Sequence, residues 1–166
     1  MNNSELETLI RNILREQLVP ATPRMQRNAI FQTVDEAVCA AHQAFLRFQQ
    51  CPLKTRSAII SAIREELMPR LTELAEESAK ETGMGNKEDK YLKNKAALDN
   101  TPGIEDLTTT ALTGDGGMVL FEYSPFGVIG SVTPSTNPTE TIINNSISML
   151  AAGNSVYFSP HLPQTH

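Results

Sequence analysis

The stretch at residues 124–161 constrains the fold of this chain more than any other part of the sequence. A short apolar run at 128–133 is entered through a glycine and left through a proline, as is typical of a buried strand in a parallel sheet. A polar loop with two prolines follows, and from Thr139 apolar residues recur at helical spacing until Gly153 ends the helix. Residues 156–158 form a second short apolar run. This order predicts an α/β fold with one strand–helix–strand unit, parallel strands and a right-handed crossover.

Two loop segments of this unit are candidates for ligand binding. In an open parallel sheet, ligands bind beyond the carboxyl ends of the strands. Residues 133–137 follow the first strand, and residues 159–161 follow the second. Neither segment carries the GxGxxG pattern of many dinucleotide-binding turns. Spacing alone therefore leaves two interpretations open, a nucleotide-binding crossover or an ordinary unit with a proline-rich turn.

Three short motifs resemble the aldehyde dehydrogenase superfamily. They are PFGV at 125–128, PSTNP at 134–138 and AAGNSV at 151–156. The extra residue in the PSTNP loop and the SPH at 159–161, where most members have Lys-Pro, resemble the CoA-acylating branch. Together with ETGMG at 81–85 and the amino-terminal helix, the resemblance narrows to the CoA-acylating propionaldehyde dehydrogenases of propanediol-utilisation microcompartments. The acylating acetaldehyde dehydrogenases of ethanolamine utilisation are the alternative.

The resemblance implies an aldehyde dehydrogenase-like fold with an incomplete Rossmann-type NAD-binding domain preceded by helices. Residues 30–161 would be the amino-terminal part of this cofactor domain, and residues 162–166 form an atypical tail. Members of the superfamily are much longer than 166 residues, so we expect a fragment that stops before the catalytic cysteine and is inactive alone. Half a parallel sheet leaves an unpaired edge, so aggregation or partial disorder is expected as well.

The resemblance also implies a reaction and a set of site residues. A cysteine thiolate attacks propionaldehyde, a hydride passes to NAD, and the resulting thioester is transferred to coenzyme A to give propionyl-CoA and NADH. Asn137 is in the position of the superfamily's asparagine, whose amide donates a hydrogen bond to the developing oxyanion; the alternative is a simple turn former beside Pro138. The residues expected to bind the cofactor are Thr133, Pro134, Ser135 and Thr136 on the nicotinamide side, and Ser159, Pro160 and His161 near the adenosine ribose.

Composition excludes several other classes of protein. The net charge of −5 gives no basic patch for nucleic acid, and no apolar run is long enough to span a membrane. The amino terminus lacks the pattern of a secretory signal, which indicates a cytoplasmic protein. Cys39 and Cys51 are therefore expected to be reduced, and neither has the position of the superfamily's nucleophile. No metal site is expected.

The first eighteen residues predict an amphipathic helix. Leucine and isoleucine follow helical spacing there, Ser4 and Glu7 form a capping box, and Pro20 ends the helix. Residues 19–29 form a polar linker with two prolines. Docking onto another protein and packing back onto the same domain are comparable interpretations. The resemblance favours docking, because it implies a tail that targets the enzyme to the microcompartment shell, placing it in the lumen. A non-catalytic targeting module is the alternative function for the chain.

Residues 30–103 are predicted to be mostly helical. Thr33 and Glu36 mark a capping box, Pro52 begins a second helix, and Pro69 predicts a break. Residues 86–100 are predicted to form a surface helix whose lysines are hydrated. Residues 113–117 form a glycine-rich turn before a strand at 118–123, and no lysine or following helix supports a phosphate cradle there. The full-length protein is expected to be a homo-oligomer.

Overall fold

The structure, a computed structural model, describes residues 29–161. The described residues belong to two compact units, one ending at Ala40 and the other beginning at Ala41. The helices are α2 (Val34–Phe48), α3 (Leu53–Leu67), α4 (Leu71–Thr82), α5 (Lys87–Asn100) and α6 (Pro138–Ala151), with short 3-10 helices η1 (Met68–Arg70) and η2 (Ile104–Asp106). The strands are β1 (Thr110–Gly114), β2 (Gly117–Phe121), β3 (Val128–Thr133) and β4 (Ser155–Pro160).

The first unit contributes the beginning of α2. The Thr33 hydroxyl accepts a hydrogen bond from the Glu36 N–H at 3.2 Å, as the capping pattern predicts. The Glu36 carboxylate accepts from the Gln32 N–H at 3.1 Å, one residue earlier than in a standard capping box. The predicted cap is therefore confirmed, with its return bond shifted by one residue. The amphipathic helix predicted at 1–18 and nearly all of the predicted linker lie outside the described residues.

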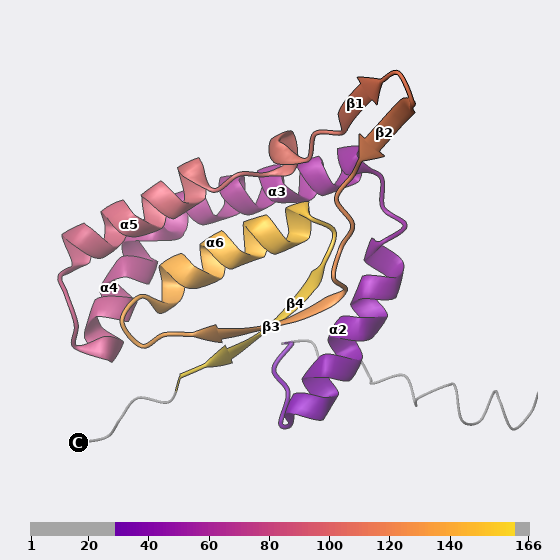
Figure 1. Ribbon diagram of the computed structural model, residues 1–166. Coiled ribbons are helices and arrows are strands. Elements are labelled where there is room, and N and C mark those ends of the chain that lie inside the picture. The colour runs from indigo at the N-terminus through magenta and orange to yellow at the C-terminus, as the bar shows by residue number, and fades with distance from the viewer. Residues whose placement is uncertain (1–28, 162–166) are drawn as a thin grey trace, which may run out of the picture. The chain divides into compact units, whose positions relative to one another are not determined.

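The core of the second unit is built around α6. In Figure 1 this helix lies between the parallel strands β3 and β4 and the helices α3 and α5, and it contacts all four. One apolar cluster joins α6 to α3, α4 and α5, and its buried members are Ile60, Leu71, Leu98, Ile143, Ile147 and Ala151. The predicted break at Pro69 is confirmed, because α3 ends at Leu67 and the short η1 follows. The packing of α3, α4 and α5 against α6 therefore fixes the position of the β3–α6–β4 crossover relative to these three helices.

The predicted crossover is confirmed in its order and strand direction. β3 and β4 pair in parallel, with Val128 opposite Ser155 and Thr133 opposite Pro160, and α6 connects them. The fold class predicted from the sequence, α/β with a partial Rossmann-like sheet, is confirmed by this unit. The glycine-rich segment differs from the prediction, because only residues 115–116 form the turn. Thr113 and Gly114 belong to β1, which pairs antiparallel with β2.

Candidate functional site

The carboxyl ends of β3 and β4 meet at one edge of the sheet. Thr133 ends β3 directly opposite Pro160 of β4, and the His161 N–H donates to the Thr133 carbonyl at 3.0 Å. The two candidate segments, distant in sequence, are therefore brought together as a strand–helix–strand unit requires. Thr133 as a whole is only 2% exposed, so it presents very little surface to a ligand.

The remaining predicted residues have differing accessibility. Pro134 and Thr136 are exposed, and Ser135 and Asn137 are half-buried in the loop between β3 and α6. At the end of β4, Ser159 is half-buried, whereas Pro160 and His161 are exposed. The two segments together offer hydroxyl, amide and imidazole groups at the strand ends. Such groups can form hydrogen bonds with the ribose and carboxamide of a nucleotide.

Asn137 is the N-cap residue of α6, but its side chain does not cap the helix. Its backbone carbonyl accepts hydrogen bonds from the N–H and the hydroxyl of Thr141, at 3.3 and 2.8 Å. Its side-chain Oδ1 accepts a hydrogen bond from the Nζ of Lys93 at 3.4 Å. The side-chain amide of Asn137 is thus not engaged in capping the helix that it precedes.

Helix α5 is hydrogen-bonded to this loop and to the first turn of α6. The ammonium of Lys90 donates to the Thr136 carbonyl at 3.1 Å, and the Asn94 Oδ1 accepts from the Thr139 hydroxyl at 2.8 Å. Lys90 is 5% exposed and Asn94 is 1% exposed. The prediction that the lysines of this helix are hydrated is therefore wrong for Lys90. Its charge is buried because it faces the polar backbone of a loop.

The AAGN motif at 151–154 forms the turn between α6 and β4. Gly153 has φ +82°, and its N–H and that of Asn154 donate to the carbonyls of Leu150 and Met149, the Schellman arrangement. The buried Asn154 then accepts from the Gly127 N–H at 3.0 Å, and the Ser155 N–H donates to the Gly127 carbonyl at 2.9 Å. The motif therefore joins the end of α6 to the start of both strands, which sets the register of the crossover.

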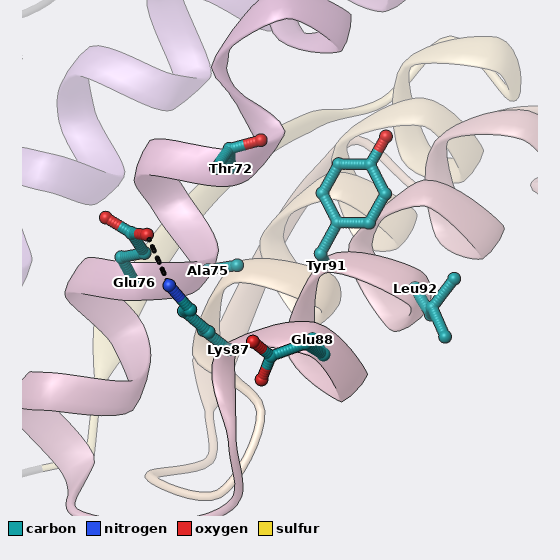
Figure 2. A pocket seen from close by; sticks show the side chains of 7 residues that line it. All are labelled: Thr72, Ala75, Glu76, Lys87, Glu88, Tyr91 and Leu92. Atoms are coloured by element: carbon teal, nitrogen blue, oxygen red, sulfur yellow. Dashed lines mark hydrogen bonds and ion pairs between the residues drawn. The ribbon is translucent and has the colours of Figure 1, made fainter.

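A separate cavity of about 360 Å³ lies between α4 and α5. Figure 2 shows the side chains that surround it, with the Lys87 ammonium 3.2 Å from the Glu76 carboxylate. The lining residues are Thr72, Ala75, Glu76, Lys87, Glu88, Tyr91 and Leu92. No residue proposed for the site lines this cavity, so it gives no support to the predicted cofactor site.

Several other predictions concern the described part of the chain. Cys39 and Cys51 are free and half-buried. Among residues 29–161, no three His, Cys, Asp or Glu side chains gather in a way that could hold a metal ion. Within the same residues, no helix is both long and apolar enough to cross a membrane.

Comparison with known proteins shows to which protein family the chain belongs. The sequence profile of the "Aldehyde dehydrogenase family" matches residues 21–165. The chain belongs to the aldehyde dehydrogenase family, which confirms the resemblance found in the sequence.

Two relatives locate the chain within the family. It is 84% identical over 161 residues to the propanal dehydrogenase (CoA-propanoylating) of Citrobacter freundii, covering 97% of this chain and 35% of the relative. It is 44% identical to the acetaldehyde dehydrogenase (acetylating) of Escherichia coli, covering 97% of this chain and 34% of the relative. The chain thus spans about a third of the length of these relatives, and of the two it is more similar to the propanal enzyme.

Solved structures give the same fold. The propionaldehyde dehydrogenase of Rhodopseudomonas palustris, with bound CoA and an acylated cysteine, is 51% identical with a TM-score of 0.78, covering 82% of this chain and 31% of that one. A propionaldehyde dehydrogenase of the fucose utilisation microcompartment of Clostridium phytofermentans is 48% identical with a TM-score of 0.76, covering 80% and 31%. An engineered glycolyl-CoA reductase with bound NADP+ is 53% identical with a TM-score of 0.76, covering 80% and 30%.

Proposed function

We propose that this chain is the amino-terminal part of a CoA-acylating aldehyde dehydrogenase that converts propionaldehyde, CoA and NAD to propionyl-CoA and NADH. The observation that carries this proposal is the 84% identity to a CoA-propanoylating propanal dehydrogenase, against 44% to an acetylating acetaldehyde dehydrogenase. The similarity extends over 97% of the chain, so it includes the helical region as well as the crossover.

Asn137 is the residue of this chain proposed to act in the chemistry. Its amide nitrogen would donate to the oxygen that becomes negative when a thiolate attacks the aldehyde. One such donor is worth about 3 kcal/mol of transition-state stabilisation. Its position just beyond β3, and a side chain that is not used to cap α6, support this role.

The two strand ends are proposed to hold the cofactor. Bound NAD would supply the hydride acceptor, and the residues of this chain would orient it. Thr133, Pro134, Ser135 and Thr136 would border the nicotinamide, while Ser159, Pro160 and His161 would border the adenosine ribose and leave room for CoA. The hydroxyl and imidazole groups of this rim fit a ribose, and the adjacent ends of β3 and β4 support the proposal.

The nucleophilic thiolate is proposed to come from outside this chain. The family's nucleophile lies beyond the cofactor-binding units, whereas Cys39 and Cys51 precede β3 in the sequence. The purified 166-residue chain should therefore form no NADH from propionaldehyde and CoA. Turnover by that chain alone would contradict this part of the proposal.

The enzyme activity can be tested by completing the chain. Residues 1–161 would be joined to the remaining part of the Citrobacter freundii relative, and NADH formation would be measured with CoA and either propionaldehyde or acetaldehyde. We expect CoA-dependent turnover with a higher kcat/KM for propionaldehyde, and a higher kcat/KM with NAD than with NADP. A preference for acetaldehyde would instead support the ethanolamine-type enzyme.

The role of Asn137 can be tested in the same full-length enzyme. Asn137→Ala should lower kcat roughly 100-fold or more, the usual loss on removal of an oxyanion donor. The matched control is Asn100→Ala, because Asn100 is exposed at the end of α5. Unchanged kcat in Asn137→Ala would show that this asparagine is only a turn former.

Residues 1–18 are proposed to dock onto shell proteins and to bring the enzyme into the lumen of a microcompartment. Their amphipathic pattern supports this proposal, as does the microcompartment origin of the similar Clostridium phytofermentans enzyme. Residues 1–18 fused to a fluorescent protein should form puncta in cells that assemble microcompartments. The control carries Leu9→Glu and Ile13→Glu in the apolar stripe. Diffuse fluorescence of the unmodified fusion would count against the docking proposal.

A further inference from the structure

One face of α5 contacts the loop that carries Asn137. Lys90, Lys93 and Asn94 are spaced at i, i+3 and i+4, so their side chains project from the same side of the helix. Each contacts a different residue of the stretch from Thr136 to Thr139. The loop is therefore supported along its length by a single helix that is distant in the sequence.

Lys93 makes the contact that bears on the chemistry. An ammonium group can only donate hydrogen bonds, so the side-chain atom of Asn137 that it contacts must be the oxygen. The amide nitrogen then points away from Lys93. Within residues 29–161, no group accepts a hydrogen bond from this nitrogen. The contact thus leaves the nitrogen of Asn137 available as a donor.

The other two contacts hold the loop independently of Lys93. Lys90 and Asn94 are almost completely buried, and they bind the Thr136 carbonyl and the Thr139 hydroxyl on either side of Asn137. Lys93 itself is exposed. Removing the Lys93 ammonium should therefore release the Asn137 side chain without displacing the loop.

We propose that Lys93 is a positioning residue that orients and polarises the side-chain amide of Asn137. The positively charged ammonium of Lys93 lies beside the amide oxygen of Asn137 and draws electron density towards that oxygen and away from the N–H groups. The N–H groups thereby become better donors to a developing oxyanion. The proposal rests on the proposed role of Asn137 as that donor. Lys93 touches neither the aldehyde nor the cofactor in this role; it acts only through Asn137.

The test uses the full-length enzyme made by joining residues 1–161 to the remaining part of the Citrobacter freundii relative. Lys93→Met removes the charge and the donor but keeps the chain length. We expect kcat to fall about tenfold, corresponding to the loss of one hydrogen bond to a charged group, with the KM for NAD and for CoA unchanged. Lys93→Arg should restore most of the activity, since it keeps both charge and donor.

Lys95→Met is the matched control on the same helix. Lys95 forms an ion pair with Asp99 and makes no contact with the loop. This variant should retain the kcat of the parent enzyme. The thermal midpoints of the Lys93 and Lys95 variants should match within measurement error, because neither side chain is buried in the core.

A double-mutant cycle separates the possible failures. If Lys93 acts through Asn137, Lys93→Met should cause no further loss of kcat in the Asn137→Ala enzyme. Equal losses in both backgrounds would overturn the positioning role in favour of a direct effect of the charge. If Lys93→Met leaves kcat unchanged while Asn137→Ala lowers it, the positioning role of Lys93 is overturned and the proposed role of Asn137 is not. An unchanged kcat in Asn137→Ala would overturn the proposed role of Asn137 itself.

Discussion

Single side chains that satisfy buried backbone groups hold the crossover together, and Asn154 is the clearest case. It is 2% exposed and its Oδ1 is the hydrogen-bond acceptor for the buried Gly127 N–H. Asn154→Ala leaves this N–H without an acceptor, whereas the Met149 carbonyl keeps its bond from the backbone of residue 154. We expect the free energy of unfolding to fall by about 1–3 kcal/mol, the cost of one unsatisfied buried group.

Urea unfolding of the chain, followed by circular dichroism, measures the effect of Asn154→Ala. The control is again Asn100→Ala, an exposed asparagine whose replacement should change the free energy of unfolding by less than about 0.5 kcal/mol. Equal effects of the two substitutions would mean that the bond to Gly127 does not stabilise the fold.

Glu105 gives the chain a predictable response to acid. Its carboxylate accepts the Gly103 N–H at 2.7 Å, and this hydrogen bond, followed by that of its own backbone N–H, lowers its pKa below 4.5. A lowered pKa in the folded state stabilises the fold above the pKa of the unfolded chain. This stabilisation is lost as the pH falls through the folded-state value.

The thermal midpoint measured over a pH series should therefore fall more steeply below about pH 4.5 in the parent chain than in Glu105→Gln. The replacement is isosteric but cannot titrate. The two curves should differ in slope in this acidic range and run parallel near neutral pH. Identical slopes would show that the Gly103 contact does not persist in solution.

The end of α6 depends on a glycine that the sequence identifies. Gly153 has φ +82°, a region that costs other residues roughly 1–2 kcal/mol, and an added Cβ would lie 2.6 Å from the guanidinium of Arg56. Gly153→Ala should lower the urea midpoint of the chain without changing the slope of the transition. Gly116→Ala serves as the control, because an added Cβ there meets no atom within 4 Å. A larger effect at Gly116 would contradict this explanation.

Elements specified by local signals could be predicted from the sequence. The strand–helix–strand order, the break at Pro69 and the stop at Gly153 all follow from residues within a few positions of each feature. The strand β1 did not follow from the strand pattern, although Asp115-Gly116 is a dipeptide that favours two-residue hairpin loops.

The surroundings of the site could not be predicted in the same way. Asn137 was identified through its motif, but the burial of Lys90 depends on a loop 46 residues away in the sequence. Helical spacing groups Lys90, Asn94 and Leu98 on one face, yet a face that begins with lysine and asparagine does not indicate burial. Only the tertiary fold shows that this polar face meets polar backbone.

At the scale of the whole molecule, the hairpin β1–β2 exposes apolar side chains on both faces. Leu112, Val119 and Phe121 share one face, and Met118 and Leu120 share the other. All five are more than half exposed within the described part of the chain. A two-stranded hairpin with uncovered apolar faces and unpaired edges is only marginally stable in water.

We therefore predict that the isolated 166-residue chain self-associates through this hairpin. Leu112→Lys combined with Val119→Glu places opposite charges on directly paired residues, which preserves the strand pairing while making one face polar. Sedimentation velocity should shift from larger species in the parent chain towards monomer in this variant. The control is Leu92→Lys, because Leu92 is 61% exposed, close to the 58% of Leu112, but lies on a helix with no free strand edge. Unchanged sedimentation of the double variant, or equal dissociation by the control, would show that association does not use the hairpin.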